Sequence, residues 1–183
     1  TSDKADLRCI PTDEIHIPVD KEAVRRSGML IPEGTEIPDT MIIRLKGRGY
    51  LTRSSLMLID LISSCNWERP LYVASTMRIE EYLDISRNLV QEGLAQRIVP
   101  YDAVAAGATI DTDKTYRNLM EKFRYGGLDN PELYLDETNI RMVLSLRRIM
   151  TETAERLISK EIPCGPAPAR PLLPGDPESR RTD

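Results

Sequence analysis

The stretch SSLMLIDLISSCNWERPLYVAS, residues 54–75, decides the fold that we expect. Its first half is apolar on nearly every side and begins with two serines that can cap a helix. This pattern predicts a buried helix over 54–65, with one of those serines as the N-cap. The second half, RPLYVAS at 69–75, favours a strand because aromatic and β-branched residues prefer extended backbone.

The same alternation continues on both sides of this stretch. MIIRL at 41–45 reads as a strand, and the glycine-containing KGRG that follows it reads as a turn. Residues 77–93 carry apolar side chains at helical spacing and end at Gly93, which is typical of a helix C-terminus. AQRIVPY at 95–101 is a third strand. Connections of about a dozen residues are those that parallel neighbours need, so we predict an α/β fold with a small, mainly parallel three-stranded sheet (β-α-β-α-β).

The regions outside this core differ from it in composition. Four prolines fall before residue 40, where EIHIPV at 14–19 predicts an edge strand and residues 20–27 a short helix ended by Gly28. The sequence also predicts a C-terminal helical hairpin, made of a helix over 111–127 and a longer one over 136–160, capped by Asp136. The predicted organisation is an extended N-terminal segment packed on the core (1–40), the α/β core (41–110), C-terminal helices (111–162) and a proline-rich tail (163–183).

Charge and hydropathy exclude several classes of protein. The chain has 183 residues, 40% of them hydrophobic and 30% charged, with a net charge of −4. Acidic and basic residues are interspersed, so no basic patch for nucleic acid is expected. No apolar run approaches the ~20 residues that span a bilayer. Because the chain begins at Thr1, we expect it to be a piece of a longer protein.

No motif for a chemical reaction stands out, and we predict no catalytic residue, no metal and no cofactor. His16 is the sole histidine, which argues against a hydrolase triad and against a Cys/His zinc site. Cys9, Cys65 and Cys164 lack metal-ligand spacing and are expected to be buried or unpaired thiols. The acidic pairs Asp111 with Asp113 and Glu80 with Glu81 each fall at a predicted helix start, where the helix dipole stabilises negative charge.

Residues 66–75, NWERPLYVAS, contain the sole tryptophan and leave two interpretations open. Trp67 can close one end of the core while its N–H finds a backbone acceptor, with Glu68 and Arg69 at the rim. Alternatively, the same ring forms an aromatic platform for a sugar or a peptide. In that case the binding residues would be Trp67, Glu68, Arg69 and Tyr72.

Five motifs, in order along about residues 9–160, resemble the C-terminal region of the DUF2723 family of membrane proteins. They are LT-x-x-x-LMLID (51–60), NWERPLYVAS (66–75), QEGLAQRIVP (91–100), NLM-x-KF-x-x-GG (118–127), and YLDET with the later Arg141-Met142 (134–142). The family is similar to GT-C glycosyltransferases, in which a polytopic membrane domain uses a lipid-linked sugar. The resemblance implies a soluble domain on the periplasmic face of the inner membrane.

The resemblance therefore implies a non-catalytic domain that binds or positions an acceptor protein or glycan beside its parent membrane domain. The alternative is a protein–protein assembly module that acts through the C-terminal helices. A third hypothesis, an independent enzyme built on carboxylates near Asp111, requires a concave site that brings them together with other polar groups. The sequence does not give the ligand or the oligomeric state.

Overall fold

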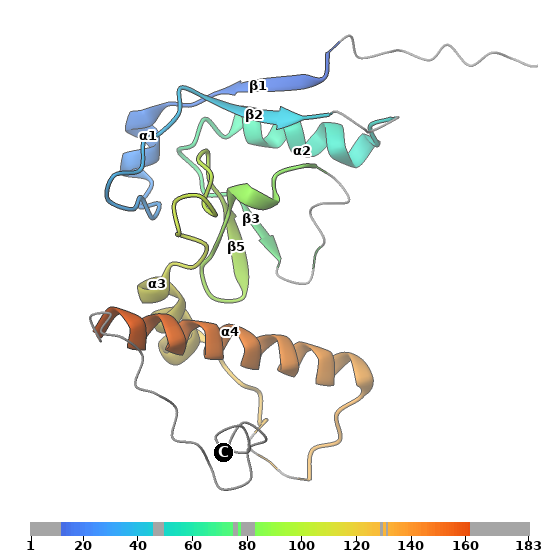
Figure 1. The fold of residues 1–183 in the computed structure, drawn as a ribbon. Coiled ribbons are helices and arrows are strands. Elements are labelled where there is room, and N and C mark those ends of the chain that lie inside the picture. Colours follow the sequence, from blue (N-terminus) through green and yellow to red (C-terminus); the bar gives the residue numbers. More distant parts are fainter. Residues whose placement is uncertain are drawn as a thin grey trace, which may run out of the picture.

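The computed structural model describes residues 12–45, 50–74, 77, 83–128, 130 and 132–161 (Figure 1). Nine helices and strands make up these residues, together with one 3-10 turn and one π-helical turn. In chain order they are β1 (Glu14–Pro18), α1 (Lys21–Arg26), β2 (Thr40–Arg44), α2 (Arg53–Ser64), β3 (Tyr72–Ala74), η2 (Ser86–Asn88), β4 (Leu89–Gln91), β5 (Ala95–Ile98), α3 (Thr112–Arg117), η3 (Asn118–Lys122) and α4 (Glu137–Glu161).

Strands β1 and β2 form a separate two-stranded antiparallel sheet. The register runs from Glu14 opposite Arg44 to Pro18 opposite Thr40. Alternate residues point inward and are buried, which is the period of two expected of a sheet with one covered face. Both predicted strands, 14–19 and 41–45, are confirmed. They pair with each other, however, so 41–45 is not a strand of the central sheet.

The central sheet has three strands in the order β3-β5-β4, and all of its pairings are antiparallel. The predicted mainly parallel sheet is therefore wrong. Strands β4 and β5 form a tight hairpin whose connection contains Gly93 at φ 93°, a left-handed conformation that glycine adopts without strain. Gly93 thus ends a strand and turns the chain back, where the sequence pattern indicated the end of a helix.

The prediction of a helix over 77–93 fails for a physical reason that can be traced. Residues 86–91 form the 3-10 turn η2 and strand β4, while 78–82 lie outside the described residues. Leu83, Ile85, Leu89 and Val90 are all buried in the main core. A short strand that is buried on both faces loses the alternation of apolar and polar residues, and its pattern then resembles a buried helix. In place of the predicted crossover helix, the chain between β3 and β5 contains β4, which pairs with β5 antiparallel.

Helix α2 is confirmed as a helix, but its predicted burial is wrong. Only Ser55 and Ile62 are buried, whereas Met57 is 62% exposed. The helix lies beside the β1–β2 sheet and contacts the protein along one side only (Figure 1). Its N-cap is also shifted from the predicted serines, because the side chain of Thr52 accepts the hydrogen bond from the backbone N–H of Ser55 at 3.1 Å.

The N-terminal segment is tied to the core by side chains that come from later parts of the chain. The indole Nε1 of Trp67 and a guanidinium nitrogen of Arg97 each donate a hydrogen bond to a backbone carbonyl of this segment, and so does the hydroxyl of Tyr101. Its apolar residues also belong to the main core; they include Ile17, Val24 and Met29. The segment is therefore an integral part of the packed body.

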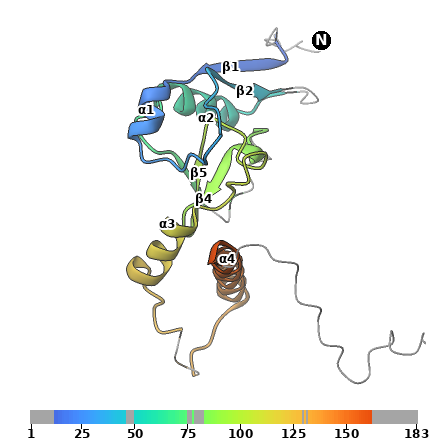
Figure 2. The same cartoon turned by 60° about the vertical axis from the view of Figure 1, so that its left-hand side comes forward.

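The C-terminal part of the described chain is helical. Asp111 caps α3, as its position at a predicted helix start suggested, and α4 begins after Asp136, whose carboxylate accepts from the N–H of Asn139 at 2.7 Å. The helix predicted over 111–127 is shorter than expected, because α3 passes into the π-helical turn η3 and ends at Lys122. Helix α4 lies beside α3 (Figure 2), and a small second core forms between η3 and α4 around Leu119, Leu146 and Ile149.

Several predictions fall on residues outside the described part of the chain. They concern Cys9, the turn at 46–49, the pair Glu80 and Glu81, Cys164 and the tail at 163–183. Among the residues that are described, no helix combines the length and the apolar character that crossing a bilayer requires.

Candidate functional site

Trp67 is buried, with 4% of its surface exposed. Its Nε1 donates a hydrogen bond to the Pro18 carbonyl at 3.0 Å, which satisfies the one polar atom of the ring. Asn66 and Trp67 both have left-handed backbone, at φ 44° and 61°, and this turns the chain sharply enough to direct the indole inward. The geometry agrees with a ring that closes the core, and a ring so covered offers no platform to a ligand.

The other three residues predicted to bind a ligand lie at the surface. Glu68 and Arg69 are exposed beyond the buried ring, at the rim that the sequence predicted. Tyr72 is half exposed on β3, and its hydroxyl donates a hydrogen bond of 2.6 Å to Oε2 of Glu92. The structure thus directs Tyr72 towards a cluster of charged residues that the sequence did not reveal.

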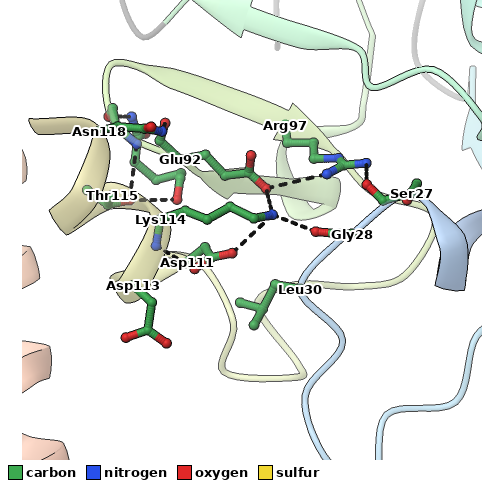
Figure 3. Close-up of polar contacts among 12 residues, drawn as sticks. Ser27, Gly28, Leu30, Glu92, Arg97, Asp111, Asp113, Lys114, Thr115 and Asn118 are labelled. Atoms are coloured by element: carbon green, nitrogen blue, oxygen red, sulfur yellow. Dashed lines mark hydrogen bonds and ion pairs between the residues drawn. The ribbon is translucent and has the colours of Figure 1, made fainter. Parts of the chain in front are cut away.

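This cluster, called here the Glu92 cluster, consists of Tyr72, Glu92, Arg97, Asp111 and Lys114. Figure 3 shows the last four of these side chains and the contacts that join them. The side chains of Glu92 and Arg97 are each only 3% exposed. Oε1 of Glu92 accepts a hydrogen bond from Nζ of Lys114 at 2.9 Å and lies 3.7 Å from a guanidinium nitrogen of Arg97. Two carboxylates therefore balance two cations in a water-poor environment.

The cluster joins three separate parts of the fold. Glu92 lies in the β4–β5 hairpin, Arg97 lies on β5 and Lys114 comes from α3. Nζ of Lys114 also donates to the Gly28 carbonyl at 2.6 Å, and Arg97 donates to the Ser27 carbonyl at 3.1 Å. The cluster consequently holds the chain after α1 against the hairpin and against α3.

The contacts of the charged groups indicate that the cluster has a structural role, in which it holds these parts of the fold together. Burial, together with the hydrogen bond to the Glu92 carboxylate, raises the pKa of Tyr72 to about 12. Oδ1 of Asp111 accepts from the backbone N–H of Lys114 at 3.0 Å, and Oδ2 lies 3.3 Å from Nζ of Lys114. Both oxygens of Asp111 are thus engaged, which leaves it poorly placed to act as a general base.

A hollow of about 350 Å³ does lie beside Asp111, lined by Asp113 and by Arg156 of α4 among others. The carboxylate hypothesis needs such a hollow, but it also needs a carboxylate that is available for proton transfer. Arg156 is itself engaged with the Gly107 carbonyl and the Thr109 hydroxyl. The structural role predicted for Asp111, at the start of a helix, accounts for its geometry.

The remaining polar candidates are dispersed. The His16 side chain is 57% exposed on β1, where its Nε2 lies 3.6 Å from the carboxylate of Glu14. Cys65 is a half-buried free thiol whose Sγ donates to the Ile62 carbonyl. In the part of the chain that the structure describes, no three acidic, histidine or cysteine side chains gather as ligands for a metal ion.

A second concave feature, called here the apolar groove, has a volume of about 380 Å³. It lies between the first half of α4, the segment that follows η3, and Leu94 at the tip of the β4–β5 hairpin. Arg124 is the one charged residue among the described residues that line it. The apolar side chains on its walls are those of Ala74, Leu94, Phe123, Tyr125, Leu128, Leu135, Met142, Val143 and Leu146.

Phe123 and Tyr125 form the aromatic part of this groove. Their ring centroids are 4.9 Å apart at an interplanar angle of 75°, an edge-to-face arrangement. The Tyr125 hydroxyl donates to the Leu119 carbonyl at 2.7 Å, which fixes its ring. Met142, on α4, remains 55% exposed at the groove. The groove is therefore an apolar surface that is already shaped and still open.

The sequence contains few signals that indicate the Glu92 cluster or the apolar groove. The residues of the Glu92 cluster come from positions 72 to 114, and their proximity depends on an antiparallel hairpin that was not predicted. For the groove the sequence holds a partial signal, since the 136–160 helix carries an apolar stripe that includes Val143, Leu144 and Met150. The number of apolar residues on that stripe exceeds what the small second core covers, and this excess could have indicated an open surface.

Comparison with known proteins gives one match. Residues 1–115 match the family model described as TMEM260-associated domain 2, which spans β1 through most of α3 and includes the whole Glu92 cluster. No curated protein and no solved structure matches the chain. TMEM260 is a family of membrane proteins. Since the match covers well over half of the 183 residues, the chain belongs to the TMEM260-associated domain 2 family.

Proposed function

We propose that this chain is a non-catalytic domain of a polytopic, glycosyltransferase-like membrane protein, and that it binds and positions an acceptor polypeptide. The observation that carries the proposal is the apolar groove, an open concave surface of about 380 Å³ beside α4. Volumes of ~300–1,000 Å³ are typical of binding pockets. The groove lies next to the matched family domain and is formed largely by residues that follow it.

The chemistry of the groove favours polypeptide over glycan. Its walls are mostly aliphatic and aromatic, and they offer few side-chain donors or acceptors for the many hydroxyls of a sugar. An extended peptide instead contributes alternating apolar side chains, which gain stability when an apolar groove removes them from water. The proposed partner is therefore an acceptor protein that binds at the apolar groove and not at the buried ring of Trp67.

The membrane context of the proposal has two supports. The chain belongs to a domain family that is associated with TMEM260 membrane proteins, and its motifs resemble the C-terminal region of DUF2723 proteins. In our proposal the domain lies on the periplasmic face of the inner membrane, beside the membrane-embedded part of the same protein. Catalysis belongs to that membrane part, and the domain presents the polypeptide to it.

Binding of defined peptides and glycans tests this function. The chain is measured against an array of overlapping peptides from secreted proteins and against a glycan array. We expect binding to a subset of apolar peptides, weakened at least tenfold by Met142→Asp in the groove. Met57→Asp on α2 is the matched control, since this methionine is similarly exposed but lies outside the groove. Binding to glycans alone, or equal losses in the two variants, would show that the groove is not an acceptor site.

A second candidate function, assembly with another subunit, rests on a different face of α4. Ile140 and Leu144 are four residues apart, so they lie on the same side of the helix, and they are 44% and 57% exposed. Such a pair suits packing against another helix. Sedimentation of the chain over a range of concentrations checks this function. Association that Ile140→Asp with Leu144→Asp abolishes would support it, and a monomer at all concentrations would exclude it.

A further inference from the structure

The apolar groove has a candidate occupant in the chain itself. Residues 168–177, PARPLLPGDP, carry proline at every third position: Pro168, Pro171, Pro174 and Pro177. The polyproline II helix has three residues per turn, so a segment with this spacing places all its prolines along one side in that conformation. Leu172 and Leu173 lie between two of these prolines and are the large aliphatic residues of this stretch.

The groove has the features that recognise such a segment. Proline-rich segments with the P-x-x-P pattern dock in grooves lined by aromatic rings, because the polyproline II helix is preformed and loses little entropy on binding. Phe123 and Tyr125 supply two rings in fixed edge-to-face contact, and Leu135 and Met142 supply the aliphatic remainder. Arg124 carries the single charge among the described residues of the groove, which leaves the site suited to the uncharged Pro-Leu-Leu-Pro sequence.

The covalent connection is long enough for this contact. The part of α4 that lines the groove, Asn139 to Leu146, precedes Glu161 by 15 to 22 residues, which at 1.5 Å per helical residue is ~23–33 Å. From Glu161 to Pro171 the chain has ten residues and reaches ~31 Å in polyproline II conformation, and to Pro174 it reaches ~40 Å. The connection contains Gly165, and glycine permits the sharp turn that this contact would require.

We propose that the segment Pro171–Pro174 binds the apolar groove of its own chain and thereby competes with the acceptor polypeptide. This inference rests on the proposed function, because it gives that binding site an internal regulator. A tethered segment competes at an effective concentration in the millimolar range for a short linker. A partner must therefore bind well enough to displace it, which restricts the site to segments that fit the groove better than Pro-Leu-Leu-Pro does.

Phe123 provides a direct test, because it is the sole phenylalanine in the chain, and Trp67 is the sole tryptophan. Incorporation of fluorophenylalanine into the full chain gives one ¹⁹F resonance, from the groove, and fluorotryptophan gives one from the buried core. We expect the variant Leu172→Asp with Leu173→Asp to shift the Phe123 resonance and to leave that of Trp67 unchanged. A peptide of residues 166–178, added to this variant, should return the Phe123 resonance to its position in the unsubstituted chain.

The same peptide measures the competition. We expect it to bind the Leu172→Asp, Leu173→Asp chain at least tenfold more tightly than the unsubstituted chain, in which the tethered segment already occupies the groove. Arg180→Ala with Arg181→Ala, in the same tail but beyond the proline repeat, is the control and should behave as the unsubstituted chain. A Phe123 resonance that is identical in all three chains overturns the proposal. So does a resonance that depends on protein concentration, since a second copy would then be the occupant.

The outcomes separate this inference from the proposed function. If the tail substitutions leave Phe123 unaffected while an array peptide shifts its resonance, the groove binds polypeptide without internal competition. If the tail substitutions shift Phe123 while no array peptide binds even to the Leu172→Asp, Leu173→Asp chain, the groove is an intramolecular contact and the acceptor function is wrong.

Discussion

Replacing Glu92 by glutamine tests whether the buried ion cluster stabilises the fold. The substitution keeps the size and shape of the side chain but removes the negative charge that faces Arg97 and Lys114. Arg97 is 3% exposed, and Glu92 is the carboxylate with which it pairs among the described residues. Lys114 is less affected, because it also contacts Asp111 and the Gly28 carbonyl and is 29% exposed.

The expected loss follows from this difference between the two cations. Removing one partner of a buried pair costs ~3–5 kcal/mol because the other charge is left uncompensated. In Glu92→Gln, Arg97 loses its carboxylate partner, whereas Lys114 keeps Asp111 and the Gly28 carbonyl. We therefore expect the free energy of unfolding to fall by an amount near the lower limit, ~3 kcal/mol. With a urea m-value of ~2 kcal/mol/M for a domain of this size, the midpoint of unfolding should fall by ~1.5 M.

Urea unfolding followed by tryptophan fluorescence measures this loss, since Trp67 is buried in the main core and is the sole tryptophan. Glu33→Gln, at an exposed glutamate, makes the same change in net charge and should cost less than ~0.5 kcal/mol. The double variant Glu92→Met with Arg97→Met should recover most of the loss, because it removes both buried charges. A loss below ~1 kcal/mol in Glu92→Gln, or an equal loss in Glu33→Gln, would refute the assignment of Glu92 as an anchor.

Three further predictions concern single side chains. Burial raises the pKa of Tyr101 to about 12. The folded state therefore keeps the hydroxyl proton at pH values where the unfolded state, with a pKa of ~10, loses it. The contribution of Tyr101 to the free energy of unfolding should be fully present below pH ~10 and should fall between pH ~10 and ~12. The alkaline loss in thermal unfolding should be smaller in Tyr101→Phe, and an unchanged pH profile would contradict this cause. Gly93→Ala should lower the free energy of unfolding by ~1–3 kcal/mol, because φ is 93° and the new Cβ would lie 3.1 Å from the Cβ of Asn118. An unchanged midpoint of urea unfolding would count against the hairpin geometry. Trp67→Phe should lower the free energy of unfolding, measured by circular dichroism, by ~1–3 kcal/mol, because it leaves a backbone carbonyl without its donor and makes the buried ring smaller. An unchanged stability would mean that the ring does not close the core.

Local structure could be predicted from the sequence where one strong signal governed a segment. The structure confirms the predicted strands at 14–19, 41–45 and 95–101 and the predicted helix over 136–160. In each of these segments one pattern dominates: alternation or β-branched residues in the strands, and a long apolar stripe in the helix. For Trp67, closure of the core was one of the two interpretations that the sequence left open, and the buried indole has the backbone acceptor that this interpretation requires.

Pairing between segments could not be predicted in the same way. One misread segment, 77–93, was enough to change the topology: its fully buried strand lacks alternation, and the helix inferred there implied parallel neighbours. The prediction therefore placed β2 in the central sheet and gave β5 parallel neighbours, whereas β2 pairs with β1 and β5 lies antiparallel between β3 and β4. Exposure of α2 was missed because an apolar helix looks buried from its composition, whereas the number of elements that can cover it is a property of the whole fold.

The three bonds from late side chains to carbonyls of the N-terminal segment have a consequence for biosynthesis. They join residues 49, 70 and 71 positions apart: Trp67 to Pro18, Arg97 to Ser27, and Tyr101 to Leu30. As the ribosome produces the chain from its amino end, β1 can pair with β2 early, but these three carbonyls wait for their donors until residues 67, 97 and 101 have emerged. Contacts so distant along the polypeptide slow folding, and unpaired strand edges that wait for partners are prone to aggregation. A ribosome stalled before residue 97 should therefore leave β3 without its partner strand β5, and the Ser27 and Leu30 carbonyls without these donors.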